Sequence, residues 1–276
     1  MKKFLFRIIR FSLPLIIIFY LKPVYLLINS RYQRVVAGDE IYLSINKTKQ
    51  NNNQKKVLIG DSAGYMLFPN KTNDSAVISL TCNQAISLAG QYILLQNYLN
   101  SGNDIDTLFM IFGPEGFLNN LDQVYTFHYF LKPFYKDEYK QYFSELVYQQ
   151  INKIPCVFLC REPYILTSNW SPNFKSQDSV DFTFLSPVSV EYLTKIKDLG
   201  KQKGFPIVLL PGPVSNRKKQ LIDTFRKDEV IPTGMQKEFE YYWANLIYLE
   251  DNLFVDGVHL KNPRPYTEYY KSNWIK

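Results

Sequence analysis

Short apolar runs alternate with helical patterns along most of the chain. Mostly apolar runs typical of buried strands occupy residues 57–59, 76–81, 107–112 and 206–210. Apolar residues recur at helical spacing in residues 86–99, 136–153 and 188–203, and the last of these segments is followed by Gly204. Strands that alternate with helices predict an α/β fold with a mostly parallel sheet and helices on both faces.

Two segments interrupt this alternation. Residues 46–56 are polar and without a period, which predicts a linker or an exposed loop. Residues 119–183 are rich in aromatic side chains and less regular, with a possible strand at residues 156–159. We therefore expect a linker at residues 35–56 and one α/β domain at residues 57–276.

The N-terminus carries a separate apolar pattern. Residues 11–21 are uncharged, and in the longer window 8–28 the only charged residues are Arg10 and Lys22. A membrane-spanning helix needs about 20 apolar residues, so this window predicts a signal anchor within residues 1–34. A cleaved signal peptide is the alternative, with residues 35–37 as its small-residue site.

The charge of the chain is concentrated in the same region. The 276 residues include 32 Lys and Arg and 25 Asp and Glu, which gives a formal charge of +7. Seven of the cations lie in residues 1–34, which contain no acidic residue, so the remainder is neutral overall. This distribution argues against a nucleic-acid-binding body. Cations before an anchor predict a single-pass membrane protein with a cytoplasmic N-terminus and an extracytoplasmic domain.

The composition predicts neither a disulfide framework nor a metal site. The chain has three cysteines, an odd number, and its two histidines lie far apart in the sequence. We expect no metal and no cofactor.

A candidate nucleophile follows the first predicted strand. Gly60 ends that strand and begins the motif Gly-Asp-Ser-Ala-Gly, in which Ser62 occupies a tight turn before a helix. Glycines allow a strained backbone and close approach of a substrate, and a helix N-terminus stabilises a developing oxyanion. A simple polar turn or helix cap is the competing interpretation.

A candidate base lies near the C-terminus. Asp256 precedes His259 by three residues, a spacing that lets the carboxylate hold one imidazole nitrogen while the other faces a serine. The competing base, His128, lies in an aromatic stretch without a nearby carboxylate, which indicates packing or a substrate contact. We predict Ser62, His259 and Asp256 as the catalytic residues.

These two blocks resemble one family of serine hydrolases more than another. Residues 60–64 also satisfy the G-x-S-x-G pattern of α/β-hydrolases, but there the acid and histidine normally lie on separate loops. An early Gly-Asp-Ser and a late Asp-x-x-His are similar to the SGNH (GDSL-like) hydrolase superfamily, across residues 57–262. The resemblance implies a flavodoxin-like sheet.

The resemblance also implies an oxyanion hole, where this sequence departs from the family. Members use the amide of the nucleophile, a glycine after the second strand and an asparagine after the third. Here Asn83, not a glycine, follows the second strand, and Glu115 stands where the asparagine after the third strand is expected. The candidate donors are therefore Asn83, Asn119 and Asn120.

Together these features predict a serine esterase or deacylase. We expect an O-acylated envelope glycan, or a similar small ester, as the substrate. Transfer of the acyl group to a sugar hydroxyl is the first alternative, and the resemblance to membrane-tethered relatives in bacterial envelope polysaccharide systems favours it. A catalytically weak glycan-binding or assembly protein is the second.

Overall fold

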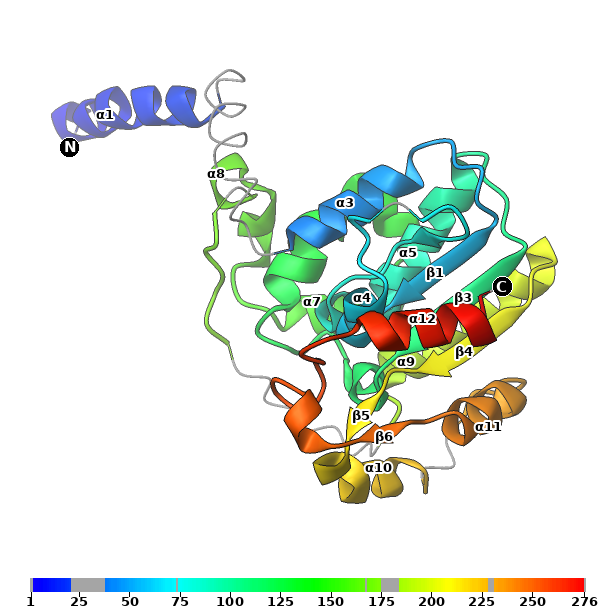
Figure 1. Cartoon of the computed structure of the whole chain (residues 1–276). Helices are drawn as coiled ribbons and strands as arrows, with labels where there is room; N and C mark the ends of the chain where they lie inside the picture. The colour runs from blue at the N-terminus through cyan, green and yellow to red at the C-terminus, as the bar shows by residue number, and fades with distance from the viewer. Residues whose placement is uncertain are drawn as a thin grey trace.

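The computed structural model describes residues 2–20, 38–72, 74–166, 168–174, 184–227 and 231–275 (Figure 1). Its central sheet has the strand order β2-β1-β3-β4, and all three pairings are parallel. The strands are β1 (Lys56–Gly60), β2 (Ile78–Ser79), β3 (Thr107–Phe112) and β4 (Ile207–Pro211). The predicted α/β class with a mostly parallel sheet is confirmed, although the second strand is shorter than expected.

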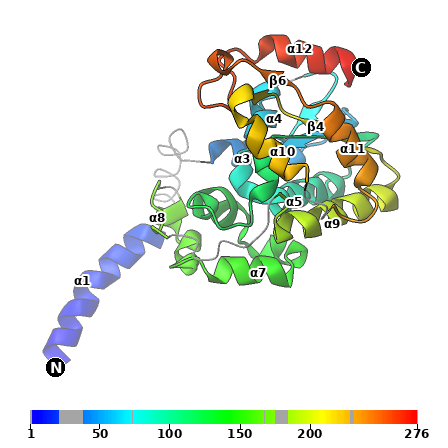
Figure 2. The same ribbon diagram turned by 90° about the horizontal axis from the view of Figure 1, so that it is seen from below.

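Helices cover both faces of the sheet because successive strand residues point to opposite sides. Val57 and Ile59 of β1 belong to the larger apolar core, whereas Leu58 between them belongs to a second core on the other face. The larger core includes side chains of α3 (Asp39–Thr48), α5 (Ser87–Asn100), α9 (Pro187–Lys203) and α11 (Gln236–Ala244). The second core includes side chains of α4 (Ser62–Leu67) and α12 (Arg264–Asn273). Figure 2 shows α12 on one side of the strands and α5 and α9 on the other.

The chain beyond β4 carries a small second sheet. Its strands β5 (Val214–Ser215) and β6 (Tyr248–Leu249) pair in parallel. The connection between them contains α10 (Lys219–Phe225) and α11. The chain leaves β6 through η7 (Asp251–Leu253) and then reaches the segment that carries Asp256 and His259.

The segment between β3 and α9 is built from short elements. They are η2 (Pro114–Leu118), the π-helical turn η3 (Phe127–Leu131), α6 (Lys132–Phe134), η4 (Asp137–Tyr142), α7 (Glu145–Asn152), η5 (Val157–Arg161) and α8 (Pro163–Leu166). The expected helix at residues 136–153 is broken, because Ser144 caps a new helix by accepting a hydrogen bond from the amide of Val147 at 3.2 Å. The possible strand at residues 156–159 is also wrong, since this stretch forms the 3₁₀ turn η5.

The expected linker at residues 35–56 contains a packed helix. Residues 39–48 form α3, whose side chains Ile41 and Ile45 are buried in the larger core. Helical spacing of a few apolar residues is sufficient for this packing, although the segment is polar on average. The linker prediction is therefore wrong for α3, and the folded body begins before residue 57.

The N-terminal helix α1 (Lys2–Tyr20) contacts α8 and exposes most of its apolar side chains. None of the helices in the described ranges is both long enough and apolar enough to cross a membrane. The apolar patch at residues 24–28, which formed part of the predicted anchor, lies outside the described residues, as does the alternative cleavage site at residues 35–37.

Candidate active site

The turn after β1 presents Ser62 at the start of a helix. Asp61 is the N-cap of α4, and its Oδ1 accepts hydrogen bonds from the amides of Ala63 at 2.9 Å and Gly64 at 3.4 Å. Ser62 is the first residue of α4 and is half-buried. Because the side chain of Asp61 fixes the first turn, the position of the Ser62 hydroxyl is set by the end of β1 and by this cap.

Asp61 also joins this turn to the neighbouring strand. Its buried Oδ2 accepts a hydrogen bond from the amide of Gly113, which directly follows β3, at 2.9 Å. Burial raises the pKa of Asp61 to about 7, and the three backbone amides and His259 oppose this rise. The role of Asp61 was not predicted, although aspartate is among the preferred residues for a helix N-cap and precedes the first residue of α4.

The raised pKa of Asp61 predicts a pH-dependent stability. Between its ordinary value of 3.8 and about 7, the native protein retains a proton that the unfolded chain has released. The free energy of unfolding therefore falls as the pH rises through this window, by roughly 2–3 kcal/mol between pH 5 and pH 8. Urea denaturation at both pH values is expected to show this loss in the wild type but not in Asp61→Asn, which cannot ionise.

The exposed Asp198 provides a matched control, since Asp198→Asn should leave the pH-dependent difference as it is in the wild type. The same pH dependence in the wild type and in Asp61→Asn would contradict the assignment.

The second predicted block forms a closed loop, residues 254–260. An antiparallel bridge joins Phe254 to Leu260, and the amide of Val255 donates to the carbonyl of His259 at 2.8 Å. Gly257 turns the loop with φ 91°, and a Cβ there would lie 2.4 Å from the guanidinium of Arg217. The positive φ favours glycine at this position, whereas the flexible side chain of Arg217 could move to make room for a Cβ.

Within this loop, Asp256 holds His259 by its ring and its backbone. Oδ2 of Asp256 lies 2.6 Å from Nδ1 of His259, and Oδ1 accepts from the amides of His259 at 2.8 Å and Val258 at 3.0 Å. Partial burial alone would raise the pKa of Asp256, but these hydrogen bonds outweigh it and hold the pKa well below its usual range. Asp256 is therefore an ionised acceptor that fixes the imidazole and leaves Nε2 of His259 for another partner.

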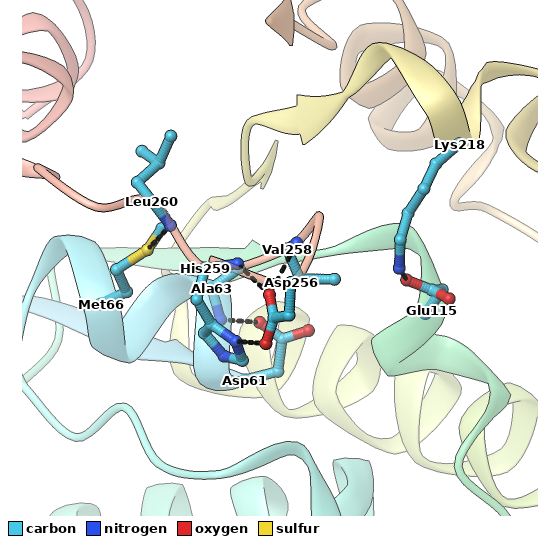
Figure 3. A network of polar contacts seen from close by, with 9 residues as sticks. All are labelled: Asp61, Ala63, Met66, Glu115, Lys218, Asp256, Val258, His259 and Leu260. Atoms are coloured by element: carbon cyan, nitrogen blue, oxygen red, sulfur yellow. Dashed lines mark hydrogen bonds and ion pairs between the residues drawn. The ribbon is translucent and has the colours of Figure 1, made fainter. Parts of the chain in front are cut away.

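The structure brings the loop beside the helix that carries Ser62. The amide of Leu260 donates to Sδ of Met66 in α4 at 2.8 Å, and His259 is close enough to Asp61 to lower its pKa. Figure 3 shows His259 and Asp256 next to Asp61 and Ala63. Within the described ranges no hydrogen bond joins Ser62 Oγ to His259. Such contacts are often long in enzymes without substrate and tighten when substrate binds.

Among the predicted oxyanion donors, Asn83 follows a residue that is hydrogen-bonded to the end of β1. The amide of the preceding residue, Cys82, donates to the carbonyl of Gly60 at 3.1 Å, which places Asn83 one residue beyond the end of β1. Oδ1 of Asn83 caps η1 (Gln84–Ile86) by accepting from the amide of Ala85 at 2.9 Å. Its Nδ2 group, on a half-buried side chain, remains able to donate to a substrate oxygen.

The structure does not support Asn119 and Asn120 as donors to a substrate. Both side chains are buried, at 0% and 1% exposure. Nδ2 of Asn119 donates to the carbonyl of Gln84 at 2.5 Å, and Oδ1 of Asn120 accepts from the amide of Val188 at 3.3 Å. Asn119 therefore supports the loop that holds Asn83, and Asn120 fixes the start of α9.

Glu115, which stands where the family has an asparagine, is held in an ion pair. Glu115, in η2, forms an ion pair with Lys218 of η6 (Asn216–Lys218) near the active-site loop (Figure 3). Sequence reasoning missed Lys218, because it lies 103 residues from Glu115 in a segment without a motif.

The competing histidine, unlike the partly exposed His259, is buried. His128 is buried in η3, where burial and the nearby Lys132 lower its pKa to about 4. It is thus neutral and enclosed, as expected for a packing residue. Across the described ranges, no group of three or more His, Cys, Asp or Glu residues could hold a metal ion.

No protein-family model, curated protein or solved structure matches this chain.

Proposed function

We propose that the protein is a serine esterase or deacylase. One observation carries the proposal: the loop with the Asp256–His259 pair lies beside the helix that begins with Ser62. The two motifs lie near opposite ends of the sequence of the folded body. A purely structural role for one motif would not require the other motif to lie beside it. A serine at a helix N-terminus with an oriented imidazole nearby is the arrangement that acyl transfer needs.

In the proposed reaction, Oγ of Ser62 attacks the ester carbonyl while Nε2 of His259 takes the hydroxyl proton. Asp256 keeps the imidazole oriented and stabilises its positive charge. The amide of Ser62 and Nδ2 of Asn83 are the proposed donors to the oxyanion. His259 then gives the proton to the leaving alcohol, and water activated by the same imidazole releases the acid and restores Ser62.

The order of the strands supports the proposed SGNH-type fold. The order β2-β1-β3-β4 equals that of the first four strands of a flavodoxin-like sheet. Ser62 follows the carboxyl end of β1, where ligands bind in open α/β sheets. We take this agreement as support for the family resemblance and for the site.

Hydrolysis is favoured over acyl transfer by the openness of the site. The side chains of His259 and Asp256 are 42% and 53% exposed, so water can reach the acyl-enzyme. An acyltransferase has to exclude water from this intermediate, and the described residues place no cover over His259.

The proposed substrate is an O-acylated glycan of the cell envelope, met by a domain outside the membrane. The support comes from α1, which exposes large apolar side chains such as Phe4 and Phe11 and has basic residues before and among them. A helix of this kind can associate with a membrane, and the cations favour a cytoplasmic N-terminus.

A fluorophosphonate probe tests the reaction and the topology together. We expect it to label the purified full chain on Ser62, as mapped by mass spectrometry, and to compete with a short-chain p-nitrophenyl ester. The matched control is Ser101, an exposed hydroxyl bound to the carbonyl of Asn97: Ser101→Ala should be labelled and Ser62→Ala should not. Labelling that is absent, or indifferent to Ser62, would contradict the enzyme proposal and favour a glycan-binding protein.

A membrane-impermeant version of the probe is expected to label intact cells. Labelling in lysate alone would contradict the extracytoplasmic placement and leave the esterase proposal intact. A sugar acceptor added to the ester assay separates the alternatives, since an acyltransferase would form the sugar ester at the expense of free acid.

A further inference from the structure

A basic cavity lies in the segment between β3 and α9, apart from the residues of the proposed active site. It has a volume of about 220 Å³ and receives residues from α6, η5, α8 and the chain between α6 and η4. Three of its lining side chains are the cations Lys132, Lys136 and Arg161, and the fourth charged one is Asp137. The remaining walls are Tyr135, Cys160 and Leu166.

Lys132 is enclosed without an acidic partner. The residue is only 1% exposed, and its Nζ donates to the carbonyl of Ser168 at 2.5 Å. In the part of the chain that the structure describes, no carboxylate lies within ion-pair distance of this ammonium group. An ammonium group has three donors, and burying its charge is costly unless an opposite charge compensates it. Burial lowers the pKa of Lys132 to about 8, so at neutral pH it is still mainly charged.

The one acidic wall does not neutralise the cavity. Asp137 is largely exposed and is shared between Arg161 at 3.6 Å and Lys140 at 2.7 Å. Outside the lining, Glu138 raises the pKa of Lys136 and Lys49 lowers it, while burial lowers it most strongly. The ring of Tyr135 lies 4.7 Å from the guanidinium of Arg161 and orients it. Positive charge therefore exceeds negative charge around the cavity.

We propose that this cavity binds the phosphate group of a ligand through Lys132, Lys136 and Arg161. A planar guanidinium and two ammonium groups can contact several oxygens of one phosphate group at once. A carboxylate ligand offers only two oxygens to the same three cations. The volume is below the ~300–1,000 Å³ of sites that enclose a whole drug-sized ligand, so the phosphate enters and the rest of the ligand extends outward. The proposal is independent of the esterase proposal.

The position of the cavity is compatible with two sources of phosphate. Leu166 belongs to α8, and α8 contacts the apolar helix α1. A lipid head group next to α1 and a soluble sugar phosphate share the same recognition chemistry.

Isothermal titration of the full chain with inorganic phosphate at low ionic strength tests the site. We expect saturable binding, with acetate binding at least about tenfold more weakly because it offers fewer oxygens and less charge. Lys136→Gln and Arg161→Gln are each expected to weaken phosphate binding by about tenfold, because each removes charge-assisted hydrogen bonds. Lys132→Met should weaken it further.

Lys140→Gln is the matched control, because Lys140 pairs with Asp137 yet does not line the cavity. Its phosphate affinity should stay within about twofold of the wild type, which corresponds to less than one lost hydrogen bond. Should Lys132→Met fail to fold, the partly exposed Lys136 and Arg161 still decide the question. Absent phosphate binding, equal binding of acetate, or unchanged affinity in both Lys136→Gln and Arg161→Gln would overturn the proposal.

Two further arms identify the source of the phosphate. For a soluble ligand, glucose 1-phosphate competes with inorganic phosphate, and flotation with vesicles is the same for the wild type and for Lys136→Gln. For a lipid ligand, vesicles of phosphatidylcholine with about one fifth phosphatidylglycerol float more of the wild type than vesicles of phosphatidylcholine alone, because the anionic surface attracts the protein. This increase is lost in Lys136→Gln. Either result supports a phosphate site.

Discussion

Replacing His259 by alanine is expected to lower kcat/KM for a short-chain p-nitrophenyl ester by about 10⁴–10⁶-fold. The loop that carries His259 contacts α4 through Leu260 and Met66, whereas His128 is buried in η3, so His259 is the proposed acceptor of the Ser62 proton. Initial rates measured with the purified full chain at neutral pH provide the test. Ser62→Ala should cause a loss of similar size, and the double variant should be little worse than either single variant, because in the proposed mechanism the two residues act as one unit.

Asp256→Asn is expected to lower kcat/KM less, by about 10⁴-fold. The serine and the histidine remain, but the imidazole loses the carboxylate that orients it and balances its charge. The low pKa of Asp256 means that its carboxylate is ionised throughout the neutral range, so this loss should be seen across that range. An exposed carboxylate shortly before the loop, Glu250, offers a control, since Glu250→Gln should keep normal activity.

The buried His128 is the control for the loss of an imidazole. Provided that His128→Gln is folded, it should retain activity within about twofold, less than the roughly 10²-fold or larger effect of removing a general base. Activity of His259→Ala within about tenfold of the wild type would refute the catalytic assignment.

Gly60→Ala is expected to be the most destabilising single substitution at the active-site turn. A Cβ on Gly60 would lie 2.3 Å from the carbonyl oxygen of Ile111 in β3, a backbone atom that cannot move without separating two central strands. Overpacking of this kind costs about 3 kcal/mol or more, which would lower the Tm by roughly 6–12 °C. Differential scanning calorimetry of the purified chain measures it.

The matched control is Gly113→Ala, at the end of the adjacent strand. A Cβ there meets Oδ2 of Asp61 at 3.5 Å, an ordinary contact, and the backbone has φ −68°, which any residue adopts. Its Tm should change by less than about 3 °C. A Gly60→Ala protein with the Tm of the control would show that the two central strands are less tightly packed than described.

The parts of the fold that could be predicted depend on local pattern. The strands at residues 107–112 and 206–210 and the helix at residues 188–203 were found because burial imposes uninterrupted apolar runs and helical spacing. The end of that helix was also predictable, since Gly204 adopts φ 81°.

The errors lie where tertiary contacts override local pattern. The pattern of residues 39–48 is polar on average and predicts a linker, yet Ile41 and Ile45 of α3 are buried in the larger core, which includes side chains of α5. The expected helix at residues 136–153 breaks at Ser144, where Oγ also donates to Glu191 of α9 at 2.8 Å. A partner 47 residues away leaves no local signal.

By itself, the sequence determined the α/β class, the candidates Ser62, Asp256 and His259, and the spacing that lets Asp256 hold His259, since each depends on residues within one turn or one period. Only the tertiary structure decided that the two motifs lie side by side, through the contact of Leu260 with Met66. It also decided that Asn119 and Asn120 are buried away from substrate, and that Lys132 is enclosed with other cations. These are contacts between segments far apart in the chain, and they form only when the sheet and its connections have assembled.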